Sequence, residues 1–516
     1  MGYPADSEDR VHYDPEDHFL ADDWTVELLN DAEINLNGVV KINGEAPTSL
    51  PSSEASDAET IAGVSSTKTI TPRRVTVIAE KYDVRRSSVV MGAGNDNTIQ
   101  MQAAADLVKA IPLGGALWIP QGVCEFSELT LGSKVSLCGA GNRSSWLTQH
   151  ANAAVGQHLI QADVDAIQIE ISDLAINGNR SNQTNVVDAI HLTNDTGAPG
   201  TNARHIINNV HIENVKGVGL YLGAFMRACQ IDKVSVYFAD LYGIQLESFA
   251  DSQIGQVEVG QSGGHGFYIH GANTVQFGQL RSWFSGRLTT GTSGYGVYIH
   301  DGSNLQFTAI LAQENSGNGI TVFGQSAVLE GLIIKQALCD GDNSVASTFA
   351  GMSLNNVARA QIGLSVRKHT GAVGTPSNAI SLAGGTTGCI IDLSYANLSS
   401  FPIVGADVGK NEFRLGRLPV VTTYAASVTP QPYTNSLVTV TLTGPITINA
   451  PNMNPLIAGT ELTVQLIQDG VGGRVTTWNA VFKTVGADVT TAGLRNIRKF
   501  ICDGTNWIQT SLSAGV

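Results

Sequence analysis

The chain has 516 residues, which is too long for one ordinary domain and long enough to bury a large core. Only 15% of the residues are charged and 56 are glycine, a composition that suits many short strands joined by tight turns. The net charge is −15, and the sequence has no basic stripe of the kind that binds nucleic acid, so that class of partner is excluded.

The negative charge is concentrated in the first part of the chain. Residues 1–60 contain fifteen acidic and two basic residues, and apolar residues such as Trp24, Leu28 and Leu29 lie between them. A solvated acidic tail is one interpretation, but the interleaved apolar residues favour a small structured module or a segment that a partner orders. We therefore expect an N-terminal attachment module at 1–60 and a linker at 61–81.

The sequence lacks the usual features of secreted and membrane proteins. The first residues, MGYPADSEDR, do not join a cationic start to an apolar run, so no classical signal peptide is expected. No apolar run reaches membrane-spanning length, so we expect a soluble protein with no membrane insertion. The six cysteines are scattered without a CxxC pair, which is typical of small core residues rather than of a disulfide or zinc framework.

From Tyr82 the pattern changes to a helix followed by short strands. Residues 97–110 space their apolar side chains helically, with Asn97 in position to cap the first turn. Residues 114–141 then alternate apolar and polar side chains between glycines. Such alternation predicts the first turns of a stacked β structure.

A degenerate repeat of about 22–30 residues follows from residue 165 onward. Each unit begins with an alternating strand, at 174–176, 210–212, 234–236, 257–259, 280–282, 332–334 and 364–366. Most units continue with a strand led by glycine, such as GLYL, GFYI or GVYI. Two strands per repeat with glycine at the corner predict an all-β parallel β-helix at 82–417. A propeller would need longer blades, and a leucine-rich repeat would show an asparagine ladder.

Residues 418–516 lose this period. Segments such as LVTVTLTGPITINAP, TELTVQLIQDG and NIRKFICDGTNWIQT alternate and contain Gly, Asp-Gly and Asn turns. They predict a C-terminal domain of antiparallel strands that resembles a β-sandwich. We expect this domain to close the last rung of the solenoid, because an open rung would expose unpaired backbone, or to hold subunits together.

Three segments resemble parts of bacteriophage tail proteins. AETIAGVSSTKTITPRRV (58–75) resembles a short segment found near the front of tail fibres. Residues 82–141, ending in GGALWIPQGVCEFSELTLGSKVSLCGAG, resemble the opening of the pectate-lyase-like β-helix of phage tailspikes. The acidic pair of that family pattern is reduced here to Asn95-Asp96-Asn97. LTVQLIQDGVGGRVTTWNAVFK and FICDGTNWIQ look like a C-terminal β-domain of phage tail proteins.

The resemblance implies a right-handed parallel β-helix that assembles as a homotrimer on the phage tail of a virion. It also implies host cell attachment: the N-terminal module would mount on phage tail or baseplate proteins, and the β-helix would bind bacterial surface polysaccharide. Many members of the family are polysaccharide depolymerases. A viral protein of this kind is assembled in the host cytoplasm, where neither a signal peptide nor disulfides are expected.

Stacking places equivalent side chains of adjacent rungs about 4.8 Å apart. One predicted outward column contains His211, Ser235, Glu258 and Arg281, and the next contains Glu213, Tyr237, Gly260, Trp283, Gln313, Lys335 and Arg367. Sugars stack on aromatic rings and bond to charged or amide groups, so these columns predict a substrate-binding surface. Its candidate members are Tyr237, Phe238, Arg281, Trp283, Gln313 and Lys335. Alternatively, an interface or a loop covers these positions.

Glycoside hydrolysis needs two carboxyl groups, about 5–5.5 Å apart for retention and about 6.5–9.5 Å apart for inversion. Glu213 and Glu258 are two rungs apart, so their backbones lie roughly 10 Å apart and their side chains could form an inverting pair. Asp240 could replace either of them. Elimination would instead need a base and a cation for a uronate, and Glu258 beside Arg281 could supply both.

A second polar face follows the glycine-led strands. Its outward residues Glu247, His270, His300 and Asp301 are second-face candidates for a site, although an outer hydrogen-bonded ladder is the more usual arrangement. No third ligand for His270 and His300 is evident from spacing, so we expect no required metal and no cofactor. Glu314, Asp340 and His369 are further candidates near the lower end of the groove.

Three functional hypotheses remain open. The leading one is a tailspike that binds host polysaccharide (O-antigen, capsule or exopolysaccharide) and cleaves it, by hydrolysis in preference to β-elimination. The second is a receptor-binding tailspike or tail fibre without catalysis. A free polysaccharide lyase is disfavoured by the fibre-like flanking segments.

Overall fold

The computed structural model describes residues 81–193, 203–224, 226–288, 294–342, 349–368, 376–395, 402–415, 418–432, 435–451 and 456–516. It also describes the antiparallel strands β1 (Ala32–Ile34) and β2 (Val40–Ile42). The rest of the expected N-terminal module and linker lies outside the described residues. The chain divides into two units after Lys81.

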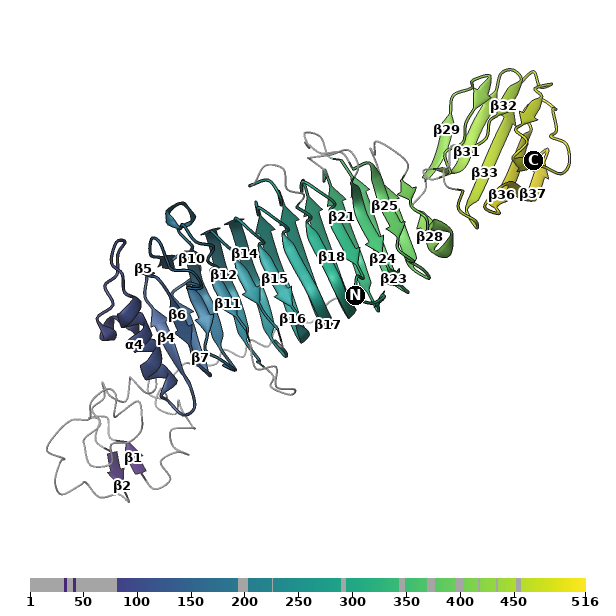
Figure 1. Cartoon of the computed structure of the whole chain (residues 1–516). Helices are drawn as coiled ribbons and strands as arrows, with labels where there is room; N and C mark the ends of the chain where they lie inside the picture. The colour runs from purple at the N-terminus through teal and green to yellow at the C-terminus, as the bar shows by residue number, and fades with distance from the viewer. Residues whose placement is uncertain are drawn as a thin grey trace, which may run out of the picture. The chain divides into compact units, whose positions relative to one another are not determined.

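Residues from Tyr82 to Leu415 form the predicted parallel β-helix, a solenoid of about 13 turns. Strands β3 to β28 form one continuous 26-stranded sheet, and successive rungs pair in parallel. Figure 1 shows these strands stacked side by side. A complete rung has three short faces, which we call A, B and C in chain order. In β17 (Phe267–Trp283) these are residues 267–270, 272–277 and 279–283.

Face A holds the glycine-led strands. They are β6 (Leu129–Leu131), β9 (Ile160–Ala162), β11 (Ile190–Leu192), β13 (Leu220–Leu222), β15 (Ile244–Glu247), β19 (Ile320–Phe323), β22 (Ala350–Asn355), β25 (Asn378–Ala383) and β27 (Ile403–Val404), with the first residues of β17 and of β18 (Val297–Gln313).

Faces B and C are formed by separate strands in the first rungs. Face B holds β3 (Tyr82–Asp83), β4 (Gly115–Ile119) and β7 (Val135–Gly139), and face C holds β5 (Gly122–Phe126) and β8 (Ser145–Gln149). Two short strands, β20 (Leu329–Glu330) and β23 (Val357–Ala358), continue face B farther along.

Longer strands bend from face B into face C. These are β10 (Glu170–Asn177), β12 (Ile206–Val215), β14 (Gln230–Ala239), β16 (Ala250–Gly260), β21 (Ile333–Asp340), β24 (Gln361–Arg367), β26 (Ile390–Tyr395) and β28 (Glu412–Leu415). In β10, β12 and β14 the bend falls on Asp173, Asn209 and Lys233, whose φ angles of 56°, 56° and 51° are left-handed. The bend makes this edge of the solenoid concave.

The core is a set of apolar columns along the solenoid. Val234, Val257 and Leu280 occupy the same inward position of successive rungs and are at most 3% exposed. The Phe277 and Phe307 rings stack at 4.3 Å between centroids. All six cysteines are free and buried, as the sequence predicts. Outward residues of the same strands alternate with these, so the fold fixes which polar side chains become neighbours.

The predicted helix forms as α4 (Thr98–Lys109) and packs on the first rung. Its Gln102 side chain exchanges hydrogen bonds with the backbone of Thr130. Asn97 is the N-cap residue, but its side chain bonds the carbonyl oxygens of Val90, Asn95 and Glu125 instead of capping the helix. Three short 3-10 helices, η1 (Val84–Ser87), η2 (Arg180–Asn182) and η3 (Val408–Lys410), complete the helical elements of the described chain.

The C-terminal domain is all-β, but its main sheet is mixed instead of antiparallel throughout. The order is β29 (Leu418–Thr422), β31 (Asn435–Leu442), β33 (Glu461–Gln468), β36 (Arg495–Cys502), β37 (Trp507–Ala514) and β35 (Phe482–Lys483). A second sheet contains β30 (Ser427–Val428), β32 (Ile446–Ile448) and β34 (Thr476–Trp478). Because the chain alternates between the two sheets, β29, β31 and β33 run parallel. The predicted antiparallel pairing holds for β33, β36 and β37.

Candidate functional site

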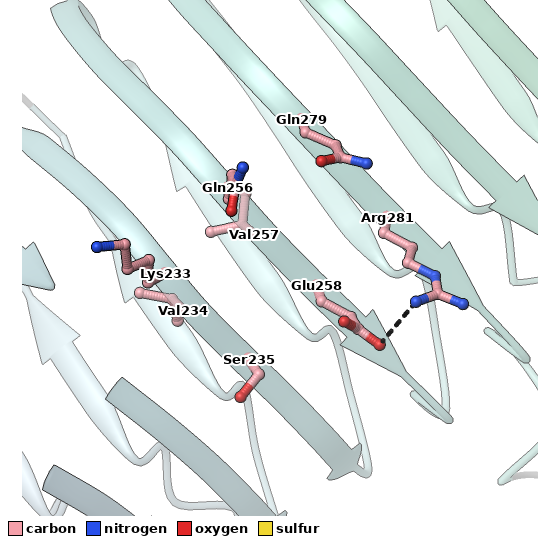
Figure 2. A pocket seen from close by; sticks show the side chains of 8 residues that line it. All are labelled: Lys233, Val234, Ser235, Gln256, Val257, Glu258, Gln279 and Arg281. Atoms are coloured by element: carbon pink, nitrogen blue, oxygen red, sulfur yellow. Dashed lines mark ion pairs between the residues drawn. The ribbon is translucent and has the colours of Figure 1, made fainter. Parts of the chain in front are cut away.

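A groove follows the concave bend between faces B and C. Its first cavity, of about 330 Å³, is lined by Lys233, Val234, Ser235, Gln256, Val257, Glu258, Gln279 and Arg281 (Figure 2). A second cavity, of about 420 Å³, lies on face B of the same rungs and is lined by Gln230, Asp232, Gln253, Gln276 and their neighbours. The linings of the two cavities are adjacent in the sequence: Asp232 lines the second cavity, and the next residue, Lys233, lines the first.

The first predicted outward column is confirmed by the strand register. His211 pairs with Ser235, Ser235 with Glu258, and Glu258 with Arg281. Figure 2 shows the Glu258 and Arg281 side chains turned toward each other from β16 and β17, with 3.7 Å between carboxylate and guanidinium. Both side chains are substantially exposed, so this ion pair is weak, and Arg281 can turn to an anionic ligand.

Two aromatic residues hold Glu258 in place. The indole nitrogen of Trp283 donates a hydrogen bond to Glu258 Oε1 over 2.9 Å. Burial, followed by the charge of Glu258 and a hydrogen bond to it, raises the pKa of Tyr237 to about 12. The Tyr237 hydroxyl therefore stays protonated and donates to the same carboxylate. Glu258 is thus held from both neighbouring rungs, by Tyr237 of β14 and by Trp283 of β17.

His211 of the first predicted column and Tyr237 and Trp283 of the second form an aromatic ladder. The His211 and Tyr237 rings lie 5.5 Å apart between centroids, and Tyr237 and Trp283 lie 5.7 Å apart in a T-shaped contact. The rung between them carries Gly260, and a Cβ atom there would lie 2.8 Å from both rings. Glycine at this position therefore lets the two rings meet and form one platform.

The other predicted carboxylates have partners of their own. The carboxylate of Glu213 contacts Asn177 of the preceding rung, Asn214 and His211 at 3.2–3.3 Å. Two of these partners are on its own strand, β12, and one is on the preceding rung. Asp240 lies between two cations, 3.3 Å from Arg180 and 3.0 Å from Lys216.

The remaining predicted binding residues are spread more widely. Gln313 pairs with Trp283, as the column predicts, but its next partner is Asp340 and not Lys335. Residues 332–334 end face B, so Lys335 lies at the bend between faces and is exposed. Phe238 follows Tyr237 at a φ of 60° and is 37% exposed.

Sequence reasoning missed the face B side of the groove. Gln230, Gln253, Gln276 and Gln306 form one exposed ladder across four rungs. Asp232 Oδ1 accepts a hydrogen bond from the backbone nitrogen of Gln256 over 2.8 Å, two residues before Glu258. The available signal was the recurrence of glutamine at 230, 253 and 276, at 23-residue intervals and each four positions before a predicted strand.

The second-face candidates meet on face A. Glu247 lies 3.0 Å from His270 Nδ1, and the His270 and His300 rings stack at 4.7 Å between centroids. Asp301 brings a carboxylate to within 4.0 Å of His300. Beside them, Tyr242, His265 and Tyr295 form a stack, and burial lowers the pKa of His265 to about 4.

Two of the three further candidates lie near the edge of face C. Glu314 is 3.4 Å from Arg287, and Asp340 is 3.1 Å from Arg367; both carboxylates are largely buried. His369 lies outside the described residues.

Comparison with known proteins bears on both parts of this chain. Residues 428–507 match the family model described as "Putative phage tail fibre C-terminal domain". The enzymatically active domain of tailspike protein 2 from bacteriophage CBA120 is similar to the solenoid, with a TM-score of 0.52 and 16% identity. That likeness covers 63% of this chain and 51% of that chain. The chain therefore joins a domain that matches a phage tail fibre family model to a parallel β-helix whose fold is similar to that of a phage tailspike.

The β-helix of this chain is also similar to the A-module of mannuronan C-5 epimerase AlgE6 from Azotobacter vinelandii. The TM-score is 0.51 at 15% identity, over 64% of this chain and 99% of that module. At such identities these likenesses show the fold. No curated protein sequence matches the chain. The described part of the chain holds no helix with the length and apolar character that a bilayer crossing requires.

Proposed function

We propose that the protein is a tail component of the virion that binds a host surface polysaccharide along the groove between faces B and C and cleaves it at Glu258. The observation that carries the proposal is the pair of cavities beside this bend, which both span the rungs of β14, β16 and β17. The phage tail fibre match at 428–507 supports the location on a phage tail. Two of the similar solved β-helices, the tailspike domain and the epimerase, are named as enzymes.

The groove suits an extended, hydroxylated chain. The glutamine ladder offers amide donors and acceptors at a spacing of about 4.8 Å, close to the length of one sugar ring. At the other wall, Tyr237 and Trp283 offer ring faces and edges for sugar C–H groups. A polymer can therefore bind along the solenoid axis with several residues engaged at once.

Hydrolysis is the reaction that the carboxylates of this groove support best. The Asp232 carboxylate contacts the nitrogen of Gln256, two residues before Glu258, which corresponds to about 7 Å along a strand. This backbone spacing leads us to propose that the two carboxyl groups can reach the separation of about 6.5–9.5 Å that inverting glycosidases use. We therefore propose Asp232 as the partner of Glu258, in place of Glu213 and Asp240, whose own partners engage them elsewhere.

β-Elimination is a second candidate because of the cations beside Glu258. Arg281 lies 3.7 Å from Glu258, and Lys233 lines the same cavity. These groups could neutralise a uronate carboxylate while Glu258 removes the neighbouring proton. This reaction requires an acidic polysaccharide, whereas hydrolysis does not.

The assembly of the protein follows from the same proposal. We propose that residues 1–60 attach to phage tail or baseplate proteins and that the spike is a homotrimer, as the family resemblance implies. Size-exclusion chromatography with light scattering measures the subunit number directly. A monomer at micromolar concentration would contradict the trimer.

The activity is tested on a panel of O-antigen, capsular and exopolysaccharide preparations. Mass spectrometry of the products distinguishes hydrolysis, which adds one water per cleavage, from elimination, which leaves an unsaturated end. We expect Glu258→Gln and Asp232→Asn each to reduce turnover by about 10²-fold or more while binding remains. Glu213→Gln is the matched control and should retain turnover to within about 10-fold. If the wild-type protein binds the polysaccharide but does not shorten it, the proposed cleavage is wrong and the protein is a receptor-binding tailspike without catalysis.

A further inference from the structure

We propose that His270, His300 and Asp301 on face A bind a divalent transition-metal ion of the Zn²⁺ type. One ligating atom from each of these residues lies within 4.8 Å of those of the other two. His270 and His300 occupy the same outward position of β17 and β18, and Asp301 follows His300 directly. The proposal is independent of the groove, which lies at the bend between faces B and C.

The spacing of the donor atoms suits one ion. His300 Nε2 and Asp301 Oδ2 are 4.0 Å apart, a separation that an ion with bonds of about 2.0–2.2 Å to nitrogen and oxygen can bridge. The imidazoles of His270 and His300 stack at 4.7 Å between centroids and 20° between planes, so their nitrogens lie on the same side of the sheet. Small side-chain rotations therefore bring all three donors to one point.

Each of the two histidines has a hydrogen-bond partner at Nδ1. Glu247 accepts from His270 Nδ1 over 3.0 Å, which directs the lone pair of that imidazole to Nε2. The Tyr268 hydroxyl lies 3.4 Å from His300 Nδ1 and can donate or accept, so it suits the tautomer that ligates through Nε2. A carboxylate or hydroxyl behind a histidine is the usual support of a metal ligand.

Asp301 accepts hydrogen bonds at both carboxylate oxygens. The Ser326 hydroxyl donates to Oδ2 over 2.8 Å, and the backbone nitrogens of Gln325 and Ser326 donate to Oδ1. Those two backbone nitrogens bond Oδ1 at 2.6 and 3.0 Å. The amide oxygen of Gln325, an exposed residue, accepts from His300 Nε2 in this structure, so a bound ion would replace that hydrogen bond and could take the same oxygen as a fourth ligand.

The donor set points to the class of ion. Two imidazoles and one carboxylate match Zn²⁺, Ni²⁺ and Co²⁺, whereas Ca²⁺ and Mg²⁺ prefer a site built from oxygen. Because the donors come from two adjacent strands, the bound ion would join the rungs of β17 and β18 and stabilise the folded solenoid.

A second histidine cluster on the same face, formed by His158, Asp188 and His191, is a poorer site. His158 Nδ1 already accepts a hydrogen bond from the backbone nitrogen of Asp188 over 3.0 Å. His191 Nδ1 lies 2.7 Å from the Asp188 carboxylate, so both imidazole nitrogens that face this carboxylate are already in hydrogen bonds. This cluster therefore provides the internal control.

The test is isothermal titration of untagged, chelator-treated full-length protein with ZnCl₂, NiCl₂ and CaCl₂. We expect one Zn²⁺ per chain, no binding of Ca²⁺ to this site, and a higher unfolding temperature with Zn²⁺. Asp301→Asn should weaken Zn²⁺ binding at least 10-fold while the fold is kept, because asparagine tolerates the left-handed φ of 57° at this position. Glu247→Gln should weaken it by about 10-fold or more.

His191→Asn is the matched control and should leave the titration unchanged. Loss of Zn²⁺ binding with His191→Asn but not with Asp301→Asn would overturn the proposal, as would the absence of any heat change up to millimolar Zn²⁺. The absorption spectrum of the Co²⁺-loaded protein gives a second readout, because His300→Asn should abolish the d–d bands of a site with nitrogen ligands.

Discussion

The Trp283 indole nitrogen and the Glu258 carboxylate form a hydrogen bond of 2.9 Å between adjacent rungs of the β-helix. Trp283 is two residues beyond Arg281, the strand partner of Glu258, so its side chain reaches back along the column to make this contact. One residue of the aromatic platform thus orients the carboxylate to which we assign the chemistry. Binding surface and reactive group are coupled by one hydrogen bond.

The first prediction concerns this hydrogen bond. Trp283→Phe keeps an aromatic ring but removes the donor to Glu258, and hydrogen bonds to charged groups contribute about 1.5–3 kcal/mol. We expect polysaccharide turnover to fall by about 10-fold or more, with a much smaller change in binding, measured by reducing-end release and by titration. Trp146→Phe is the control, because its indole nitrogen donates to the carbonyl of Arg143. Equal losses in the two variants would contradict the coupling.

The second prediction concerns the glycine beneath the platform. Alanine at Gly260 would bring a Cβ atom within 2.8 Å of the Tyr237 and Trp283 rings, and both would have to move. We expect a loss of about 1–3 kcal/mol in unfolding free energy and weaker polysaccharide binding. The control is Gly409→Ala, where a Cβ atom meets nothing within 4 Å. Wild-type binding and unfolding temperature in Gly260→Ala would show that the platform does not depend on this glycine.

The third prediction concerns a carboxyl group inside the solenoid. Burial raises the pKa of Asp342 to about 7, and its Oδ2 has no hydrogen-bond partner among the described residues. Between pH 4 and pH 7 the folded protein keeps Asp342 protonated, whereas the unfolded chain loses this proton. The free energy of unfolding should therefore fall as the pH rises from about 4 to about 7 and change no further above that. Asp342→Asn should remove the effect and gain on the order of 4 kcal/mol relative to wild type across this window.

Thermal unfolding of both proteins between pH 4 and pH 8 measures the difference. A constant difference between variant and wild type across that range would contradict the raised pKa.

The fourth prediction concerns the buried imidazole of His205, which should destabilise the fold at low pH, the reverse of the effect of Asp342. Burial lowers the pKa of His205 to about 4, and its Nδ1 accepts a hydrogen bond from the backbone nitrogen of Ile169. In the unfolded chain His205 is protonated below about pH 6.5, whereas in the folded protein it stays neutral down to about pH 4. The free energy of unfolding should therefore fall as the pH falls from about 6.5 to about 4. His205→Asn keeps an acceptor near Ile169 and should reduce this loss by on the order of 3 kcal/mol, measured by denaturant unfolding. An unchanged acid-induced loss in the variant would contradict the assignment.

Much of the fold could be predicted because the solenoid repeats a local pattern. The inward column of Val234, Val257 and Leu280 is visible in the sequence, and the outward neighbours Ser235, Glu258 and Arg281 follow from it by alternation. The prediction for Lys335 was wrong because residues 332–334 alternate in the same way but lie on face B. Alternation shows that a strand exists, not which of the three faces it occupies.

The site could be predicted only in part, because hydrogen-bond direction does not follow from spacing. Glu213 and Glu258 are two rungs apart, as expected, but Glu213 bonds to Asn177 of the preceding rung whereas Glu258 bonds to Trp283 of the following one. Asp232 was missed because it lies beyond the bend at Lys233, where a left-handed residue turns the chain and makes the groove concave. The parallel strands of the C-terminal domain were missed for a related reason, since β29, β31 and β33 each follow a passage through a second sheet.

The most direct test of the central claim is a crystal structure of the Glu258→Gln variant with an oligosaccharide prepared from the host polysaccharide. We predict sugar density along the groove, with the scissile bond between residue 258 and Asp232, amide contacts from Gln253 and Gln276, and a ring against Trp283. Density confined to face A, or to the C-terminal domain, with none in this groove would contradict the account.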